Sequence, residues 1–370
     1  MPSAAAEAAA DSKATQSGRA SKSARSKKRR ALARELTGKC SELLGESIES
    51  LEYPGGRSRR SIRLVLKNGN TAIASVRPQR SRAATECSVL EELPVRGAPV
   101  PRLLASDGRN TLIQEDLGGI RLAQAMHGAE ELQVERLLDN ALTGLSQAQR
   151  AGSAAGFDER FETLGDRRDW LVGFLDRPAV IGRILDTPAP PPALQELEKL
   201  LAVRKPRFVK WDARPGNAMV RENGRVFWID WEHCGTRNRL DDMAWVLGDE
   251  HVPDCPLVEE RLIKKHIARF ADDLSVEEAM QYLFAYGVFH MTVRLGLIGK
   301  YRMTKGEWWD HDYCVERDKV GVTLTCLERI CTRAARWAQR NPHTEPLAPW
   351  FGEIFTRLDQ YKNEPTSSTS

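Results

Sequence analysis

Hydrophobic and polar residues alternate along residues 61–66 and again along residues 71–76. A period of two is typical of strands that bury one face and expose the other. Asn68 and Gly69 lie between the two runs, and this dipeptide predicts a type I′ turn, in which both central residues have a positive φ. The pattern therefore predicts an antiparallel β-hairpin near the start of the chain.

The residues after the hairpin predict one helix and two further strands. Hydrophobic side chains of residues 81–93 recur at helical spacing, with Leu90 and Leu93 on the same face. A glycine and two prolines in residues 97–104 end that helix and begin a strand, and residues 111–114 have the composition of another strand. This region is therefore expected to form a β-rich unit with a single helix.

Two glycines, Gly118 and Gly119, follow the last of these strands. They suit a hinge, because glycine adopts backbone conformations that other residues avoid. Beyond them the hydrophobic spacing is mainly helical, except for a second hairpin that is predicted around Asn223 and Gly224. A capping box that begins at Ser275 predicts the start of a long apolar helix.

The order of these elements predicts an α+β fold with two lobes, a small β-rich lobe followed by a larger and mainly helical lobe. We place the small lobe, an antiparallel sheet with one helix, at residues 31–117, and the helical lobe at residues 118–365. Residues 1–30 are rich in Ala, Ser, Lys and Arg. Because they lack the apolar residues of a hydrophobic core, they are predicted to be a disordered basic tail.

The net charge of the whole chain, +4, conceals an uneven distribution. Residues 1–30 contain eight Lys and Arg against two Asp and Glu, which leaves a net charge of −2 for the rest of the chain. A nearly neutral body argues against a nucleic-acid-binding face on the folded part. An RNA-associated protein that uses the basic tail stays open as an alternative, although such charged blocks usually remain solvated.

No stretch of 18 or more apolar residues occurs, so a membrane span is not expected. The seven cysteines include no Cys-x-x-Cys pair, and the tail lacks the apolar core of a secretory signal. We therefore expect a cytoplasmic protein with reduced thiols. The sequence leaves its oligomeric state open.

Three residues around the second hairpin form the most informative pattern. Asp212 is followed five residues later by Asn217, and Asp230 comes directly after the returning strand. Phosphoryl transfer needs a carboxylate that accepts the proton of the attacking hydroxyl, and it needs oxygen ligands for the metal ions that bridge the phosphates. Mg²⁺ prefers a few such oxygens together with water and phosphate oxygens. The pattern therefore predicts a catalytic Asp212 and a magnesium site at Asn217 and Asp230.

This segment resembles the aminoglycoside phosphotransferase and choline kinase-like family. The family pattern is His-Gly-Asp-x-x-x-x-Asn, a hairpin and then Ile-Asp-Trp/Phe-Glu, and this chain is similar to it from Asp212 to Glu232. Further resemblances, in the family's order, extend over residues 48–248. Membership would imply a two-lobed, protein-kinase-like fold. It would also imply a small-molecule kinase that transfers the γ-phosphoryl group of Mg²⁺–ATP to a hydroxyl group.

The resemblance also implies a nucleotide site in the small lobe. Residues 55–61 resemble the family's phosphate-covering loop, and residues 115–118 resemble the hinge whose backbone meets adenine. Arg77 takes the position of the cation that grips the phosphates, and Glu86 takes that of a glutamate on the following helix. The nucleotide-binding residues implied in this way are Gly55, Gly56, Ser58, Arg77, Glu86, Glu115 and Leu117.

Three positions depart from the family pattern. Arg77 stands where protein kinases have a lysine, although arginine also binds phosphate through its bidentate fork. Lys210 and Trp211 replace the His-Gly pair before the catalytic Asp. They bring a positive charge close to Asp212 and a bulky ring to the substrate approach. A catalytically degenerate relative, which binds nucleotide or acts as a scaffold, therefore stays open as an alternative.

The acceptor is expected to bind in the C-terminal helical region, where residues 307–313 mix aromatic and acidic side chains. Such a mixture holds a cationic amine through cation–π and carboxylate contacts, but it is also typical of tryptophans packed against a core. Glu232 stays open as a second acceptor-facing residue. An amino alcohol or amino sugar is one acceptor class among other small hydroxyl compounds. A zinc site at His233 or His311 is not expected, because their spacing supplies no further ligands.

Overall fold

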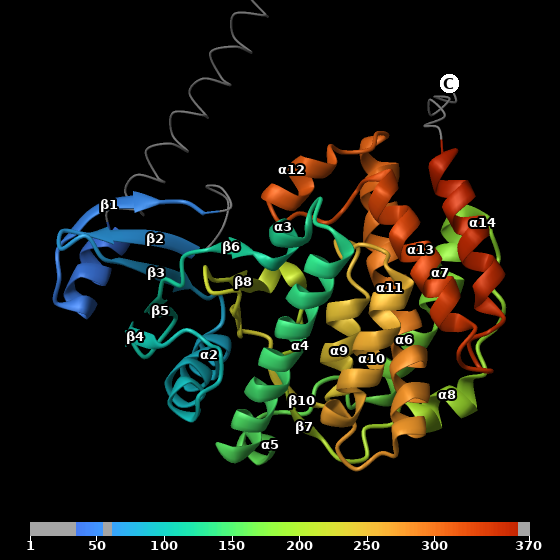
Figure 1. Cartoon of the computed structure of the whole chain (residues 1–370), viewed down its shortest axis with the longest axis horizontal. Helices are drawn as coiled ribbons and strands as arrows, with labels where there is room; N and C mark the ends of the chain where they lie inside the picture. Colours follow the sequence, from blue (N-terminus) through green and yellow to red (C-terminus); the bar gives the residue numbers. More distant parts are fainter. Residues whose placement is uncertain (1–34, 55–60, 362–370) are drawn as a thin grey trace, which may run out of the picture.

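The computed structural model describes residues 35–54 and 61–361, and these residues form two parts (Figure 1). Among them, a sheet of five antiparallel strands lies on one side, in the order β1-β2-β3-β5-β4. The strands and the helix predicted in this small part are present, but the expectation of a single helix is wrong, because residues 35–44 form a second one. The expected tail at residues 1–30 lies outside the described residues. The elements are β1 (Ile48–Glu52), β2 (Ser61–Leu66), β3 (Thr71–Val76), α2 (Arg80–Glu92), β4 (Leu103–Ser106) and β5 (Thr111–Glu115).

The turn between β2 and β3 differs from the predicted type I′ geometry. Gly69 has a φ of 85°, whereas Asn68 is not among the residues with a positive φ. The N–H of Leu66 donates to the carbonyl of Asn70 over 2.9 Å, and the N–H of Gly69 donates to the carbonyl of Leu66 over 2.9 Å. These bonds close a loop of three residues, in which only the last needs the left-handed conformation. Gly69 supplies it without steric cost.

The larger part is built around the long helix α11 (Val276–Lys305). Its predicted capping box is confirmed, because the Ser275 side chain accepts the N–H of Glu278 and the Glu278 side chain accepts the N–H of Ser275. The other helices of the described chain are α3 (Leu122–Met126), α4 (Glu131–Ala154), α5 (Phe157–Arg160), α6 (Arg168–Leu175), α7 (Arg177–Leu185), α8 (Leu194–Leu200), α9 (Leu240–Leu247), α10 (Pro256–Phe270), α12 (His311–Glu316), α13 (Leu324–Ala338) and α14 (Leu347–Asp359).

Short strands interrupt the helical part and carry the loops of the site. The second predicted hairpin is confirmed as β8 (Ala218–Val220) and β9 (Val226–Trp228), and β8 also pairs with β6 (Ile120–Arg121). The sequence analysis missed β6, and it also missed β7 (Arg207–Val209) and β10 (Gly235–Arg237), which pair with each other. Strands of two or three residues are too short to produce a readable alternation of hydrophobic and polar positions.

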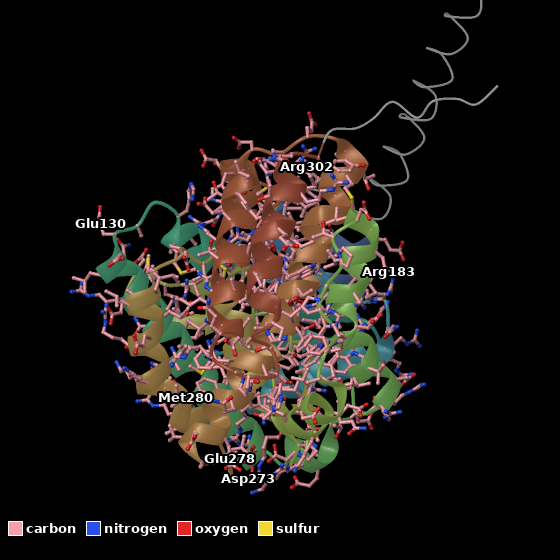
Figure 2. All side chains as sticks on the ribbon, turned by 90° about the vertical axis from the view of Figure 1, so that its right-hand side faces the viewer. Glu130, Arg183, Asp273, Glu278, Met280 and Arg302 are labelled. Atoms are coloured by element: carbon pink, nitrogen blue, oxygen red, sulfur yellow. The ribbon has the colours of Figure 1, made fainter. Side chains whose placement is uncertain are left out.

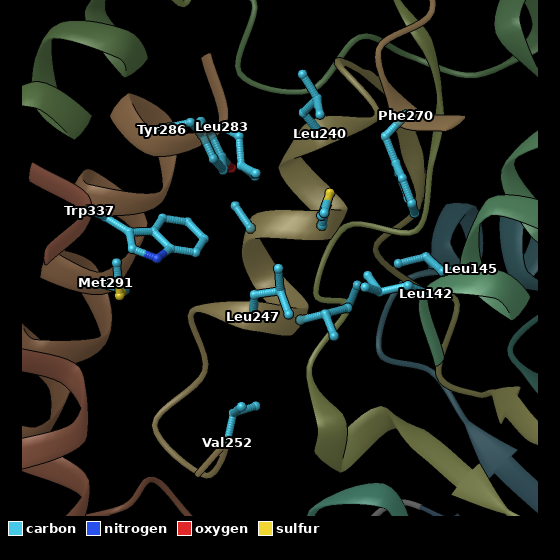
Figure 3. Packing of buried hydrophobic residues seen from close by; sticks show 14 of the residues in the cluster. Leu142, Leu145, Leu240, Leu247, Val252, Phe270, Leu283, Tyr286, Met291 and Trp337 are labelled. Atoms are coloured by element: carbon cyan, nitrogen blue, oxygen red, sulfur yellow. The ribbon is translucent and has the colours of Figure 1, made fainter. Parts of the chain in front are cut away.

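The core of the helical part lies where α9 and α13 pack against α11 (Figure 3). Gly287 of α11 allows this close approach, because a Cβ atom there would overlap the ring of Trp337 on α13. Burying a large apolar side chain stabilises a fold by about 1.5–3 kcal/mol, so this cluster fixes α9 firmly in place. Its buried side chains include Leu240, Leu247, Leu283, Met291 and Trp337.

A smaller core lies in the sheet part, where a helix at residues 35–44 packs on β2, β3 and β5. Its buried members are Cys40, Leu64, Leu66, Ala72, Ala74 and Ile113. Charged residues cover the outside of the helical part, as Figure 2 shows for Glu130, Arg183, Asp273 and Glu278. None of the described helices is long and apolar enough to cross a membrane.

Candidate active site

The loop that carries Asp212 begins after β7 and has an unusual backbone. Trp211 and Asp212 have φ angles of 50° and 68°. A left-handed conformation costs a non-glycine residue about 1–2 kcal/mol, so other contacts must hold this loop. Asp242 of α9 provides them, because its carboxylate accepts the N–H of Lys210 over 2.7 Å and the N–H of Trp211 over 2.8 Å.

Asp242 is a fully buried support for this loop. Burial raises the pKa of Asp242 to about 6, and hydrogen bonds from Lys210, Gln149 and Trp211 oppose the rise. The Gln149 amide on α4 donates to the Asp242 carboxylate over 2.9 Å. The sequence analysis missed this support, because the contact joins two segments that only the packing of α4 and α9 brings together.

Asp212 and Asn217 lie side by side in the loop, as the sequence predicts. The Asn217 amide donates to Oδ2 of Asp212 over 2.8 Å, and Nε of Arg214 donates to Oδ1 over 2.9 Å. The Asp212 side chain keeps 23% of its surface exposed. Its carboxylate is therefore oriented by two neighbours and still reachable from the solvent.

Asp230 lies at the end of the second hairpin, next to the same loop. The carbonyl of Asn217 accepts the N–H of Ile229 over 2.9 Å, which fixes the two metal-binding candidates relative to each other. Oδ1 of Asp230 lies 2.8 Å from Nη2 of Arg77. Burial alone raises the pKa of Asp230, but the charges of Arg77 and Lys210 outweigh it and hold that pKa below its ordinary value.

Lys210 connects the loop that carries Asp212 with the segment that carries Asp230. Its Nζ donates to the carbonyl of Asp230 over 2.8 Å and to the carbonyl of Asp212 over 3.4 Å, and it lies over the ring of Trp231. The side chain is fully buried, and this burial lowers the pKa of Lys210. Lys210 therefore supports the loops through their backbone. Trp211 packs into the helical part, with its ring 6.0 Å from that of Trp170 and 6.1 Å from that of Trp245.

A cavity of about 320 Å³ lies between the sheet and the second hairpin, and Asn217 and Asp230 line one side of it. Apolar side chains from the sheet and from the second hairpin line this cavity, and the part of it next to them is named the apolar slot. Both hinge candidates, Glu115 and Leu117, line the cavity. The slot residues are Ile73 on β3, Met219 on β8 and Ile229 after β9.

Arg77 also lines this cavity and pairs with Glu86, through bonds of 2.6 Å from Nε and 2.7 Å from Nη2. Burial lowers the pKa of Arg77, but the carboxylates around it outweigh burial and raise that pKa. Glu232 was open as an acceptor-facing residue, but it lies in this cavity and accepts Nη1 of Arg77 over 3.0 Å. The remaining nucleotide candidates, Gly55, Gly56 and Ser58, lie outside the described residues.

A family comparison now identifies the chain at the level of its family. The model of the phosphotransferase enzyme family (APH) matches residues 51–283, which is more than half of the chain. The chain belongs to the phosphotransferase enzyme family. The match includes the hinge candidates, both metal-binding candidates and residues 210–217, which are named the catalytic loop for the candidate base Asp212 that they carry. The two-lobed α+β architecture expected from the sequence accompanies it.

No curated protein matches the chain in sequence. Solved structures with a similar fold include proteins from several bacteria. An aminoglycoside phosphotransferase from Alicyclobacillus acidocaldarius is 14% identical, with a TM-score of 0.48, 81% of this chain covered and 95% of the other. A choline kinase from Streptococcus pneumoniae is 15% identical, with a TM-score of 0.46, and the match covers 83% of this chain and 98% of the other. A choline/ethanolamine kinase family protein from Mesorhizobium loti is 15% identical, with a TM-score of 0.47, and the match covers 84% of this chain and 92% of the other.

This phosphotransferase has a second cavity, of about 820 Å³, on the side of the catalytic loop where α11 ends and α12 begins. The predicted aromatic and acidic segment lines it. Some of these rings also pack, since Trp309 lies 5.6 Å from Tyr301 and Trp308 lies under the guanidinium of Arg302. The lining residues are Tyr301, Lys305, Glu307, Trp308, Trp309, Asp310, Tyr313, Asp318, Lys319 and Val320.

Asp318 connects this cavity to the catalytic loop, and the sequence analysis missed it. Its carboxylate lies 3.6 Å from Nη1 of Arg214 and 3.7 Å from Nη1 of Arg121, which follows the hinge. A Cβ atom on Gly216 of the catalytic loop would overlap Asp318. No local sequence pattern identifies Asp318. Its partner Arg214 lies inside the recognised motif, and this arginine was a signal that an acidic partner comes from elsewhere in the chain.

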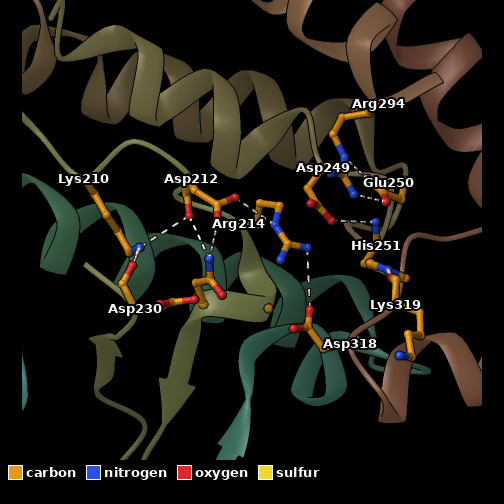
Figure 4. A network of polar contacts seen from close by, with 12 residues as sticks. Lys210, Asp212, Arg214, Asp230, Asp249, Glu250, His251, Arg294, Asp318 and Lys319 are labelled. Carbon is orange, nitrogen blue, oxygen red and sulfur yellow. Dashed lines mark hydrogen bonds and ion pairs between the residues drawn. The ribbon is translucent and has the colours of Figure 1, made fainter. Parts of the chain in front are cut away.

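A buried charged cluster behind the catalytic loop holds the segment that carries Asp318 (Figure 4). Glu250 accepts Nε of Arg294 over 2.9 Å and the N–H of Gly321 over 3.2 Å. Nε2 of His251 lies 2.9 Å from the carbonyl of Lys319. The wall of the second cavity is therefore anchored to the residues that follow α9, the same helix that supports the catalytic loop.

Proposed function

We propose that this phosphotransferase is a small-molecule kinase that transfers the γ-phosphoryl group of ATP to a hydroxyl group of its acceptor. The proposal rests on the proximity of Asp212, Asn217 and Asp230, in which a partly exposed carboxylate lies close to two oxygen-bearing side chains at the edge of a cavity. Phosphoryl transfer depends mainly on such positioning and on charge stabilisation. The family match supports the reaction class.

Asp212 is the proposed catalytic base, which orients the acceptor hydroxyl and takes its proton. Arg214 and Asn217 hold its two carboxylate oxygens, over 2.9 and 2.8 Å. This preorganisation supports the role, because a fixed base needs little reorganisation when the acceptor arrives. The partial exposure of its side chain leaves room for a hydroxyl group.

Asn217 and Asp230 are the proposed ligands for Mg²⁺. Both offer hard oxygen atoms at the cavity edge, the donor type that Mg²⁺ prefers. The cation of Arg77 lies 2.8 Å from the Asp230 carboxylate, so this position already accommodates positive charge. Bound Mg²⁺ would supply charge neutralisation for the phosphates.

Arg77 and Glu86 are the proposed phosphate-positioning pair, and the apolar slot is the proposed site of adenine. Glu115 and Leu117 would meet the base through their backbone, as in the hinge that this segment resembles. The loop with Gly55, Gly56 and Ser58 is proposed to cover the phosphates. With these assignments, Mg²⁺–ATP is the proposed nucleotide.

The second cavity is the proposed acceptor site. It adjoins Arg214 through Asp318, and it combines several aromatic rings with three acidic residues, Glu307, Asp310 and Asp318, against two lysines, Lys305 and Lys319. Acidic and aromatic groups together favour a cationic acceptor. An amino alcohol or amino sugar with a free hydroxyl group fits this chemistry.

A thermal-shift titration with ATP, with and without Mg²⁺, tests the nucleotide site. Ligands that bind the folded state alone raise its stability. We expect a magnesium-dependent shift in the wild type, a loss of that dependence in Asp230→Ala, and a normal response in the control Asp176→Ala, whose half-exposed side chain does not line the cavity. The absence of any shift in the wild type would contradict the proposed function.

Two further measurements separate the alternatives left by the sequence. Phosphate transfer to a panel of amino alcohols and amino sugars distinguishes a kinase from a nucleotide-binding scaffold, which would shift with ATP but release no ADP. RNA binding by the whole chain and by a chain without residues 1–30 tests the RNA-associated alternative. Binding that depends on the tail, without any response to ATP, would favour that alternative.

A further inference from the structure

Every nitrogen of the Arg77 guanidinium group has a carboxylate partner among the described residues. Nε and Nη2 contact Glu86 over 2.6 and 2.7 Å, and Nη2 also lies 2.8 Å from Asp230. Nη1 donates to Glu232 over 3.0 Å. The Arg77 side chain keeps only 6% of its surface exposed, so its group is enclosed by these three partners.

Four of the five N–H donors of Arg77 therefore face carboxylates, and Arg77 must exchange at least one partner before it can hold phosphate oxygens through a bidentate grip. A guanidinium group has five N–H donors in a fixed plane, and a bidentate grip uses two of them. Glu86 is fully buried and held through two bonds, so its release would leave a buried charge without its partner. Asp230 can release Arg77, because the proposed Mg²⁺ would take the place of Arg77 as the cation beside its carboxylate. Glu232 is therefore the remaining carboxylate that competes with phosphate oxygens for Arg77.

Glu232 extends its negative charge into the cavity proposed for the nucleotide. Its side chain lines that cavity and is 11% exposed. Apart from Arg77, the nearest cation is Arg82 on α2, whose Nη1 lies 3.8 Å from Oε2 of Glu232. Two other arginines line the cavity, but Arg63 is paired with Asp116 over 2.5 Å and Arg121 lies 3.7 Å from Asp318. Around Arg77 and Arg82, the three carboxylates of Glu86, Asp230 and Glu232 are therefore in excess, which disfavours nucleotide phosphates at this end of the cavity unless a metal ion adds positive charge.

We propose that Glu232 sets the magnesium dependence of nucleotide binding, by holding Arg77 and by opposing the nucleotide phosphates until Mg²⁺ arrives. The inference rests on the proposed function, in which the cavity binds ATP. It also gives a reason for arginine at position 77, because a lysine ammonium has three donors and no planar fork for these carboxylates.

Calorimetric titration with ADP, in EDTA and in excess Mg²⁺, tests the proposal without requiring an acceptor. Glu232→Gln keeps an oxygen that accepts Nη1 of Arg77 but removes the charge. We expect it to bind ADP about tenfold more tightly than the wild type in EDTA. In Mg²⁺ the change should be less than about twofold. The charge-preserving Glu232→Asp should stay near the wild type, and Glu232→Ala should change in the same direction as Glu232→Gln.

Glu135→Gln is the matched control, because Glu135 is also paired with an arginine, over 2.6 Å to Arg261, but lies on α4 outside the cavity. It should leave ADP affinity unchanged in both buffers. Equal or weaker metal-free binding by the folded Glu232→Gln and Glu232→Ala variants would overturn the inference and leave the proposed function intact. A wild type that binds no ADP even in Mg²⁺ would instead remove the proposed function on which the inference rests.

Discussion

Asp318 contacts Arg214, the residue that orients the proposed catalytic base. Oδ1 of Asp318 lies 3.6 Å from Nη1 of Arg214, and Nε of Arg214 donates to Oδ1 of Asp212 over 2.9 Å. Asp318 lies between α12 and α13 and lines the second cavity. The relationship connects the proposed acceptor site to the orientation of Asp212.

Asp318→Asn should reduce Mg²⁺–ATP turnover, measured as ADP release, by about 10- to 100-fold, because a loosened Arg214 no longer fixes the base. ADP affinity should remain near that of the wild type. Asparagine has the same shape and tolerates the positive φ of 47° at this position. Asp169→Asn is the control, since Asp169 is exposed, is paired with Arg167 over 2.7 Å and lines neither cavity. An equal loss in both variants would contradict the positioning role.

Asp212→Asn should abolish transfer while it spares nucleotide binding. The amide retains the shape of the side chain but does not accept the hydroxyl proton, and the loss of a general base typically costs about 10²–10⁴ in rate. Initial rates of transfer and the thermal shift with Mg²⁺–ATP should be measured on the same preparation. Unimpaired turnover would remove Asp212 from its assigned role.

Gly216→Ala should destabilise the protein, because the new Cβ atom would overlap the Asp318 carboxylate. Overpacking of a close contact typically costs about 1–3 kcal/mol. Gly352→Ala on the exposed face of α14 is the matched control, because its Cβ atom would meet no neighbour within 4 Å. That control should gain up to about 1 kcal/mol from helix propensity. Urea denaturation measures both, and equal stabilities would refute the tight contact.

Asp242 should make stability fall as the pH rises from about 4 to 6. Its pKa is about 6 in the folded protein, against an ordinary value of 3.8. The folded state therefore binds more protons than the unfolded state in this window, and the free energy of unfolding decreases as the proton is lost. Relative to Asp242→Asn, which does not titrate, the wild type should lose about 2–3 kcal/mol. Urea denaturation at several pH values checks this, and parallel curves would contradict it.

The sequence by itself determined the elements and motifs that depend on neighbouring residues. The alternation in β2 and β3 predicted the hairpin, because side chains of a strand alternate between its two faces. It did not predict the turn type, since Asn68 and Gly69 are compatible with loops of two or three residues. The short distance from Asp212 to Asn217 likewise made their juxtaposition predictable, because a single loop carries both.

Only the tertiary structure decided which distant charges surround those residues. Glu232 accepts a hydrogen bond from Arg77 across 155 positions of sequence, and Asp242 holds the backbone of Lys210 across 32. Asp318 reaches Arg214 because the cluster around Glu250 anchors its segment. A buried carboxylate pairs with whichever donor the packing of helices and strands brings within hydrogen-bond distance. That choice depends on the positions of whole elements, which local sequence patterns do not encode.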